Sequence, residues 1–189
     1  MMESIRAYFE KMVPLTEQDW QVFSSKLVKR EFPKKSVILK GGQTETYLSF
    51  IEKGIVRLYI PKEENDLTFG FTFENEFVSA YDSFITQTPC TYQLQALADT
   101  SLWSVSYQDL QHIYKHSSIG NTIGRYAAEN LFLIKTRREL SLLNESAEKR
   151  YRKLFEERPQ LIRQIPLKYI ASYIGITPQA LSRIRARIS

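Results

Sequence analysis

Short apolar runs separated by turn-forming residues occupy positions 32–106 of the chain. In the run 67–73, leucine and phenylalanine alternate with Thr68, Gly70 and Thr72, which is the period of two that a strand with one buried face shows. Many short strands at this spacing are typical of an antiparallel sandwich or a jelly-roll barrel. Further strands are expected at 36–39, 47–51, 55–60, 93–98 and 101–105.

Before the strand pattern begins, apolar residues follow helical spacing, and residues 1–30 are expected to be helical. Thr16 is a suitable N-cap, and Trp20, Phe23 and Leu27 then follow at steps of three and four. These three side chains would form one apolar face.

A long helix is expected from residue 119, because apolar residues recur there at alternating steps of four and three. Heptad spacing favours a helix that pairs with a second copy of the chain, and Asn130 in the seam would fix its register. The alternative is a long helix that packs only on its own domain. A hinge at 141–146 and a helix at 147–157 are expected next. The seam proposed for the dimer helix is Ile119, Ile123, Tyr126, Asn130, Leu133 and Leu140, with Arg137 between the last two.

The segment 165–188 predicts two short helices joined by a tight turn. Pro166 and Pro178 suit the first position of a helix, and Thr177 is a good N-cap for the second one. Gly175 lies where a left-handed residue would end the first helix. This order is that of a helix-turn-helix. The residues expected to face its core are Leu167, Ile170, Ala171, Ile174, Leu181, Ile184 and Ile188.

The outer face of the second helix carries side chains that suit the edges of DNA bases. Arg183 can grip guanine with two hydrogen bonds and Gln179 can pair with adenine. Ala186 can contact a thymine methyl group, and Ser182 lies at the edge of the same stripe. The alternative is a pair of packed helices with a basic exposed face. The full set of predicted DNA-binding residues is Lys168, Thr177, Gln179, Ser182, Arg183, Arg185, Ala186 and Arg187, of which Lys168, Arg185 and Arg187 suit phosphates.

Charge separates the two ends of the 189-residue chain. Residues 135–189 hold 13 Lys or Arg and 5 Asp or Glu, a net charge of +8, whereas residues 1–134 have a net charge of −3. This asymmetry favours a C-terminal module that faces a polyanion. Cys90 is the single cysteine, which excludes an internal disulfide and a cluster held by several cysteines. The sequence shows neither a membrane-spanning run nor a signal peptide, so we expect a cytoplasmic protein with no membrane partner.

Several segments together resemble the Crp–Fnr superfamily of bacterial transcription regulators. The run from Ile165 to Arg185 is similar to the DNA-reading segment of that family, and 146–151 is similar to the helix that leads into it. Turns at 41–43 and 53–54 match the family's sheet half more loosely. The resemblance implies an α+β chain with a cyclic-nucleotide-binding-like jelly roll at 1–114, a central dimerisation helix at 115–142 and a helix-turn-helix domain at 143–189. It also implies a homodimer on a near-palindromic site in double-stranded DNA, a small-molecule effector, and contact with RNA polymerase if the protein activates transcription.

The predicted effector pocket departs from the pattern of that family. Members that bind cyclic AMP carry a Gly-Glu pair and, ten residues later, an Arg followed by Ser or Thr. Here Ser79 and Ala80 replace the pair, and Cys90 with Thr91 replaces the second motif. Burying a phosphate without a cation is costly, so the sequence argues against cyclic AMP and leaves the effector unknown. The candidate pocket residues, which are also candidates for plain barrel core, are Phe71, Ser79, Ala80, Tyr81, Cys90, Thr91 and Tyr92.

Catalytic and metal chemistry receive little support from the sequence. His112 and His116 have a spacing that can bind a metal, but no third histidine exists and no Glu follows His112. We therefore expect no catalytic residues, no metal and no cofactor, and we do not expect an enzyme. Two alternatives remain: a small-molecule sensor that acts through a protein partner rather than DNA, and a metal-dependent jelly-roll enzyme.

Overall fold

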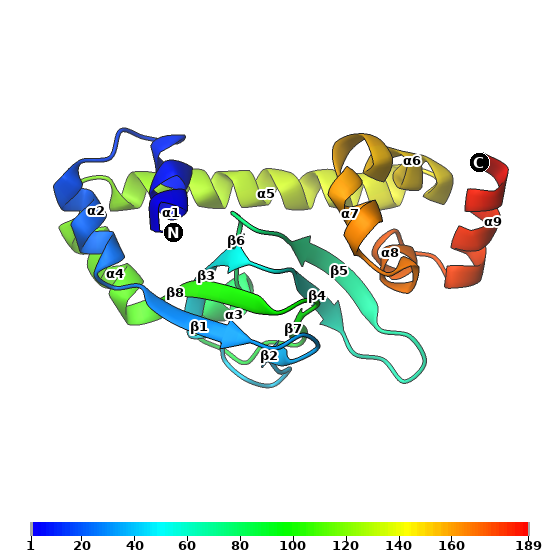
Figure 1. Ribbon diagram of the computed structural model, residues 1–189, viewed down its shortest axis with the longest axis horizontal. Coiled ribbons are helices and arrows are strands. Elements are labelled where there is room, and N and C mark those ends of the chain that lie inside the picture. Colours follow the sequence, from blue (N-terminus) through cyan, green and yellow to red (C-terminus); the bar gives the residue numbers. More distant parts are fainter. Residues whose placement is uncertain (1, 189) are drawn as a thin grey trace. The chain divides into compact units, whose positions relative to one another are not determined.

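The computed structural model describes residues 2–188, which form two compact units (Figure 1). The first unit contains residues up to 58 together with 71–129. The second contains residues 59–70 together with the chain from 130 onward. A β-hairpin and a long helix therefore each contribute residues to both units.

All the strands expected from the sequence are present, with small differences at their ends. Two strands were not expected, β1 and the two-residue β6. The strands are β1 (Val28–Phe32), β2 (Val37–Leu39), β3 (Tyr47–Lys53), β4 (Val56–Ile60), β5 (Leu67–Thr72), β6 (Phe77–Val78), β7 (Gln93–Ala96) and β8 (Thr100–Ser106).

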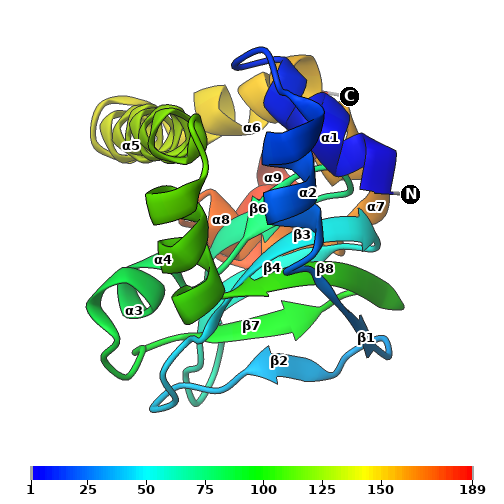
Figure 2. The same cartoon turned by 90° about the vertical axis from the view of Figure 1, so that its left-hand side faces the viewer.

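The strands form two four-stranded sheets, which confirms the expected jelly roll. One sheet has the order β1-β8-β3-β6 and the other β2-β7-β4-β5. Figure 2 shows β2 and β7 side by side in the second of these sheets. β1 pairs antiparallel with β8, and β8 with β3. Ser49 faces Ser104 across β3 and β8, and a 2.8 Å hydrogen bond between their buried hydroxyls satisfies both polar groups.

The prediction of helix throughout residues 1–30 is wrong at its end. The helices α1 (Met2–Glu10) and α2 (Glu17–Ser24) are present, and the Thr16 hydroxyl caps α2 by accepting the N–H of Asp19 at 3.1 Å. The chain then enters β1 at Val28. Because β1 is an edge strand whose residues stay exposed or half-buried, its sequence carries no apolar alternation that would reveal it.

Helices α1, α2 and α4 (Tyr107–His116) pack on the first sheet through one aromatic-rich cluster. The rings of Phe9 and Phe23 lie 4.8 Å apart in an edge-to-face arrangement. Burial of each such side chain contributes about 1.5–3 kcal/mol to folding. The short helix α3 (Tyr81–Thr86), which was not expected, adds Phe84 to the same core. The buried members are Ile5, Phe9, Trp20, Phe23, Phe50, Phe84, Val105, Leu110 and Ile113.

Gly54, between β3 and β4, is a position where the fold tolerates no side chain. Its φ is +106°, and an added Cβ would lie 2.4 Å from Thr100 Oγ1 and 2.8 Å from Thr100 Cα. We expect Gly54→Ala to destabilise the protein by more than about 2 kcal/mol. Gly42→Ala is the matched control, because Gly42 has a φ of +85° but nothing within 4 Å of an added Cβ. Thermal unfolding should show a larger loss of stability for Gly54→Ala than for Gly42→Ala. Equal losses would mean that the positive φ alone, and not the contact with Thr100, causes the destabilisation.

The chain beyond β8 is helical, as expected, but its breaks differ from the prediction. The proposed hinge at 141–146 is shorter, because α5 continues to Asn144. The helix expected at 147–157 is present with those bounds as α6, and Pro159 then starts a helix that was not expected, α7. The helices are α5 (Gly120–Asn144), α6 (Ala147–Glu157), α7 (Pro159–Gln164), α8 (Leu167–Tyr173) and α9 (Pro178–Ile188).

The alternation expected in β5 reverses at its first two residues. Leu67 is 46% exposed, whereas Thr68, expected on the outer face, is 1% exposed. The Thr68 N–H donates a 2.8 Å hydrogen bond to the hydroxyl of Ser172, in α8. The hairpin residues 59–70 thus belong with the C-terminal helices, and contacts there override the local pattern.

Candidate nucleic-acid interface and the cassette of the barrel

Helices α8 and α9 form the expected helix-turn-helix, and its turn has the predicted chemistry. Gly175 has a φ of +80°. The N–H of Ile176 donates to Ala171 O at 3.0 Å and that of Gly175 to Ser172 O at 3.1 Å, which is the pattern of a Schellman motif. The Thr177 hydroxyl accepts the N–H of Ala180 at 3.2 Å and so caps α9.

The inner face of this motif is mostly buried, and two of its predicted residues are not. Leu181 is 1% exposed and Ile184 5%, while Ile188 is half-buried near the end of α9. The prediction fails for Leu167, which is 39% exposed because it is the first residue of α8 and precedes the buried turn of that helix. The buried members of α8 and the residue that follows it are Ile170, Ala171 and Ile174.

The predicted base-reading stripe lies on the surface. Gln179, Ser182, Arg183 and Ala186 are all exposed, as are the flanking residues Lys168, Thr177, Arg185 and Arg187. The Ser182 hydroxyl donates to Pro178 O within α9 at 3.1 Å. Within residues 2–188 no hydrogen bond or ion pair engages the side chains of Gln179, Arg183 or Arg187. These groups are available to an external partner.

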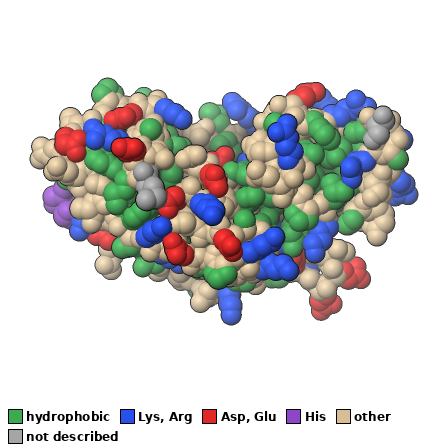
Figure 3. Space-filling view, in the orientation of Figure 1, with side chains coloured by type: hydrophobic (Ala, Val, Ile, Leu, Met, Phe, Trp, Pro, Cys, Tyr) green, Lys and Arg blue, Asp and Glu red, His purple; other side chains and the backbone are tan. Residues whose placement is uncertain are grey.

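Basic side chains are frequent on this unit, and Figure 3 shows Lys and Arg gathered over its helices. One of the predicted phosphate-binding residues also has a structural contact. Burial raises the pKa of the Tyr151 phenol in α6, and a hydrogen bond from the Arg185 side chain partly offsets this rise. Arg185 therefore helps to join α9 to α6, a role that the sequence did not reveal.

The long helix α5 exposes large apolar side chains between Tyr126 and Leu143. In the predicted seam Tyr126 is 41%, Leu133 49% and Leu140 52% exposed, and Asn130 is exposed beside them. Ile119 and Ile123 are half-buried, and Ile123 packs on the aromatic-rich cluster of the barrel. Large exposed apolar side chains in one helix mark an interaction surface. The sequence did not single out Phe132 and Leu143, which are 69% and 74% exposed.

The candidate effector-pocket residues, most of which lie in the segment 79–92 that we call the cassette, make mostly internal contacts. Cys90 is buried, and its Sγ donates to Tyr92 O at 3.1 Å. Burial raises the pKa of the Cys90 thiol, which makes it less reactive. The Tyr92 hydroxyl donates to the Asp82 carboxylate, and the Ser79 hydroxyl to Tyr47 O at 2.9 Å. Of the other candidates, Phe71 and Ala80 are buried, Tyr81 is half-buried and stacks on Phe84, and Thr91 is exposed.

A buried carboxylate that the sequence analysis overlooked lies beside this cassette. Glu45 is 5% exposed, and its side chain accepts the N–H groups of Thr46 and Tyr47 at 3.0 Å and of Ala80 at 3.5 Å. Burial raises its pKa, which the backbone donors partly offset. The Glu45 side chain therefore ties the chain at Thr46 and Tyr47 to the cassette at Ala80.

Arg57 in β4 is a second buried charged residue that the sequence analysis missed. Its side chain is the largest of the fully buried ones, at 1% exposure. The Ile-Val-Arg-Leu-Tyr run around it reads as plain strand, and only long-range packing reveals its burial. Segment 79–91 thus contains no Lys or Arg, but the barrel does bury one cationic side chain, that of Arg57.

Neither a metal site nor a membrane-spanning helix is found among residues 2–188. No three His, Cys, Asp or Glu side chains there come together in a way that could hold a metal ion. The rings of His112 and His116 stack 4.0 Å apart on the exposed side of α4. No helix in the described part of the chain is both long and apolar enough to cross a bilayer.

Comparisons with known proteins agree with this architecture. Residues 29–117 match the cyclic nucleotide-binding domain family. A comparison with curated protein sequences found no match.

Solved structures share the fold over most of the chain. CLP from Xanthomonas campestris, described as a c-di-GMP responsive global regulator, is 18% identical, with a TM-score of 0.69 over 92% of this chain and 91% of that one. A Eubacterium rectale protein described as a regulator of the crp/fnr family is 18% identical, with a TM-score of 0.72 over 92% and 83%. FixK2 from Bradyrhizobium japonicum is 16% identical, with a TM-score of 0.70 over 86% and 84%.

Proposed function

We propose that this chain, which has the fold of the Crp–Fnr transcription regulators, is itself a sequence-specific DNA-binding regulator that acts as a homodimer. Its helix-turn-helix would place α9 in the major groove. Two such helices, one from each subunit, would read a near-palindromic site whose half-sites are about one helical turn apart. Such a protein works in the compartment that holds the DNA, and as an activator it would also contact RNA polymerase.

The observation that carries this proposal is the contrast between the two faces of α9. Leu181 and Ile184 are buried, so one face of the helix packs inside the motif. Gln179 and Arg183 project from its exposed face with no protein partner among residues 2–188. Arginine and glutamine make the bidentate contacts that distinguish guanine and adenine in the major groove.

Homodimer formation is the second part of the proposal, and α5 supports it. Its exposed apolar side chains at Tyr126, Leu133 and Leu140 follow heptad spacing, and Asn130 lies in the same seam. Pairing with the same helix of a second copy would remove these side chains from water and would set the register through Asn130.

The effector proposal is a small molecule other than cyclic AMP. The cassette has Ala80 and Cys90 in place of the glutamate and arginine that hold the nucleotide in the related proteins, and the Glu45 carboxylate occupies the Ala80 N–H. A cyclic phosphate would therefore find no cation to pair with in segment 79–91.

Saturating cyclic AMP should leave thermal unfolding of the full chain unchanged. A ligand at a hundred times its dissociation constant adds about 2.7 kcal/mol of stability. For a chain of this length, that corresponds to a rise of about 5–10 °C in Tm. A rise of that size would contradict our interpretation of Ala80, Cys90 and Glu45 and would make the protein a cyclic-nucleotide-gated regulator.

The proposal is tested by selecting bound sequences from a library of random duplexes with the full chain. We expect enrichment of one near-palindromic motif. Recovery of duplexes without a shared motif would contradict sequence-specific recognition and would favour the alternative, a sensor that acts through a protein partner. The matched control is Arg183→Ala in the same selection, because it removes one base-reading group and leaves the buried face of α9 intact.

A further inference from the structure

One buried carboxylate joins the N-terminal ends of two helices that are far apart in the sequence. Asp19 lies in the first turn of α2 and is 6% exposed. Its oxygens also contact residues 117 and 118, in the three-residue linker 117–119 between α4 and α5. Figure 1 shows α2 and α4 at the same end of α5. All of these residues belong to the first unit.

The Asp19 carboxylate accepts hydrogen bonds from both sides. The Thr16 hydroxyl donates to Oδ2 at 2.5 Å and accepts the Asp19 N–H at 3.1 Å, which completes the cap of α2. From the linker, the Ser117 hydroxyl donates to Oδ1 at 2.9 Å, and the N–H and hydroxyl of Ser118 each donate at 3.1 Å. The carboxylate therefore holds the linker just before the first turn of α5, where a negative charge suits the positive end of a helix.

Hydrogen bonding keeps this carboxyl group ionised although it is buried. The Thr16 hydroxyl has the largest effect and lowers the pKa of Asp19. Burial opposes it, and the hydrogen bonds from Ser117 and Ser118 lower the pKa further, so the pKa stays below its ordinary value. Hydrogen bonds to a charged acceptor are roughly twice as strong as those between neutral groups.

Close packing at two glycines leaves the start of α5 little room to shift against α4. An added Cβ at Gly120 would lie 2.9 Å from Ile113 O. One at Gly124 would lie 2.9 Å from the hydroxyl oxygen of Tyr114. The Asn121 side chain donates to Tyr114 O at 3.3 Å. The corner between α4 and α5 is thus fixed by α4 on one side and by the buried carboxylate of α2 on the other.

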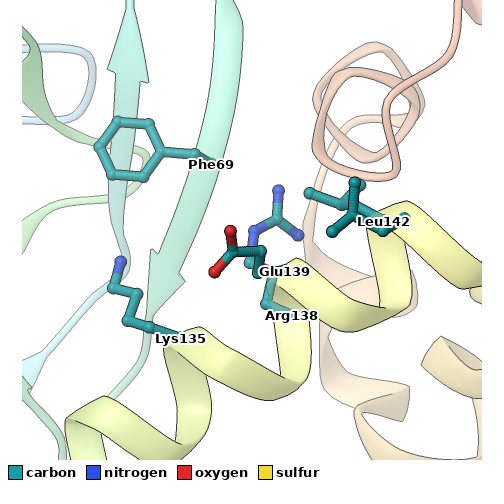
Figure 4. A pocket seen from close by; sticks show the side chains of 6 residues that line it. Phe69, Lys135, Arg138, Glu139 and Leu142 are labelled. Carbon is teal, nitrogen blue, oxygen red and sulfur yellow. The ribbon is translucent and has the colours of Figure 1, made fainter.

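The part of α5 next to this corner carries the first half of the proposed dimer seam. Residues 120–129 belong to the first unit and include Ile123, which packs on the aromatic-rich cluster, and Tyr126, which is 41% exposed. In the second unit, α5 makes a contact of another kind beside a pocket of about 390 Å³ (Figure 4): the Lys135 ammonium lies 5.3 Å from the centre of the Phe69 ring. A cation–π contact of an exposed lysine is weak, so the buried carboxylate is the firmer attachment.

We propose that Asp19 is a positioning residue for the dimer helix, because it fixes the corner from which α5 extends to meet a second copy of the chain. This inference rests on the proposed function, since it concerns how α5 is presented for pairing. A helix that is already held in place loses less freedom when the subunits pair, which tightens the dimer. By linkage, pairing must in turn slow the opening of the corner.

The test compares two variants that break hydrogen bonds to the same carboxylate on different sides. The double variant Ser117→Ala/Ser118→Ala frees the linker. Thr16→Ala frees α2 and leaves the linker contacts in place. In hydrogen exchange of the full chain, we expect the amides at 118–124 to exchange at least about tenfold faster in the double variant. Thr16→Ala should leave the exchange of these amides unchanged.

Analytical ultracentrifugation at a series of concentrations gives the dimer dissociation constant of each variant. If loss of the linker contacts leaves α5 correctly placed in about one third of the chains, the constant rises about tenfold, because this fraction enters once for each subunit. Thr16→Ala should keep the constant of the unmodified protein. Asp19→Asn, which keeps the shape of the side chain but not its charge, should raise the constant as the double variant does.

A conservative variant separates positioning from a loss of folding. Ser117→Thr/Ser118→Thr keeps both hydroxyls and should restore the slow exchange and the dissociation constant of the unmodified protein. The proposal is overturned if the double alanine variant pairs as tightly as the unmodified protein, or if Thr16→Ala weakens pairing as much. If the unmodified protein is a monomer at every concentration, the proposed homodimer itself fails, and faster exchange at 118–124 would then show that Asp19 is only a structural cap.

Discussion

Replacing Arg183 with alanine should remove discrimination at one base pair of each half-site, with a loss of about 1–3 kcal/mol for the preferred base. Arg183 is exposed on α9, with no protein partner among residues 2–188, so the fold should not depend on its guanidinium. Titration of labelled duplexes that differ at single positions measures this loss directly. The variant should bind the preferred and the substituted base at that position almost equally.

Two other arginines serve as controls for this measurement. Arg187→Ala, at a predicted phosphate contact, should weaken binding to all duplexes alike and reduce the salt dependence by about one counterion. Arg163→Ala removes the same charge from an exposed position on α7, outside the predicted interface, and should leave base preference intact. If Arg183→Ala behaves like Arg163→Ala, α9 does not read bases through Arg183.

A charge in the seam of α5 should convert the protein to a monomer and abolish tight binding to a two-fold site. Leu133 is 49% exposed, so Leu133→Glu should leave the fold of each chain intact while placing two carboxylates in a paired apolar seam. A dimer gains avidity because its second half-site is bound at high local concentration, and losing it should weaken binding by about 100-fold or more. Light scattering gives the mass in solution, which should fall from twice 22.1 kDa to 22.1 kDa.

The matched control for this prediction is Ile85→Glu. Ile85 is 52% exposed, but it lies on α3 and outside the proposed seam. This variant should keep the mass of the unmodified protein and its affinity for DNA. A dimeric Leu133→Glu with unchanged binding would contradict the assignment of α5 as the dimer helix.

Local chemistry made the helix-turn-helix predictable from the sequence. The turn needs a left-handed residue, an N-cap and a favourable first residue of α9. Gly175, Thr177 and Pro178 supply them within four consecutive positions of the sequence. The strands of the barrel were also predictable, because their apolar runs lie between turn formers. The match at 29–117 to the cyclic nucleotide-binding domain agrees with that part of the prediction.

Long-range contacts explain what the sequence concealed. Glu45 and Arg57 are charged residues in ordinary positions of the chain, and the sequence around them does not reveal that both are buried. Ser172 meets Asp66 and Thr68 across about a hundred residues, and this contact also reverses the expected burial at the start of β5. The spacing of apolar residues in the sequence predicts which face of a strand or helix is buried in its own core. It does not predict that a distant segment, such as α8 at Thr68, will cover another face.

The most direct test of sequence-specific recognition is the ratio of two affinities at one salt concentration. The full chain is titrated with the selected duplex and with a scrambled duplex of the same length and composition, near physiological salt. A regulator of the proposed kind should bind the selected duplex at least about 1,000-fold more tightly. Equal affinity for the two duplexes would contradict sequence-specific recognition, because backbone charge alone would then account for all of the binding.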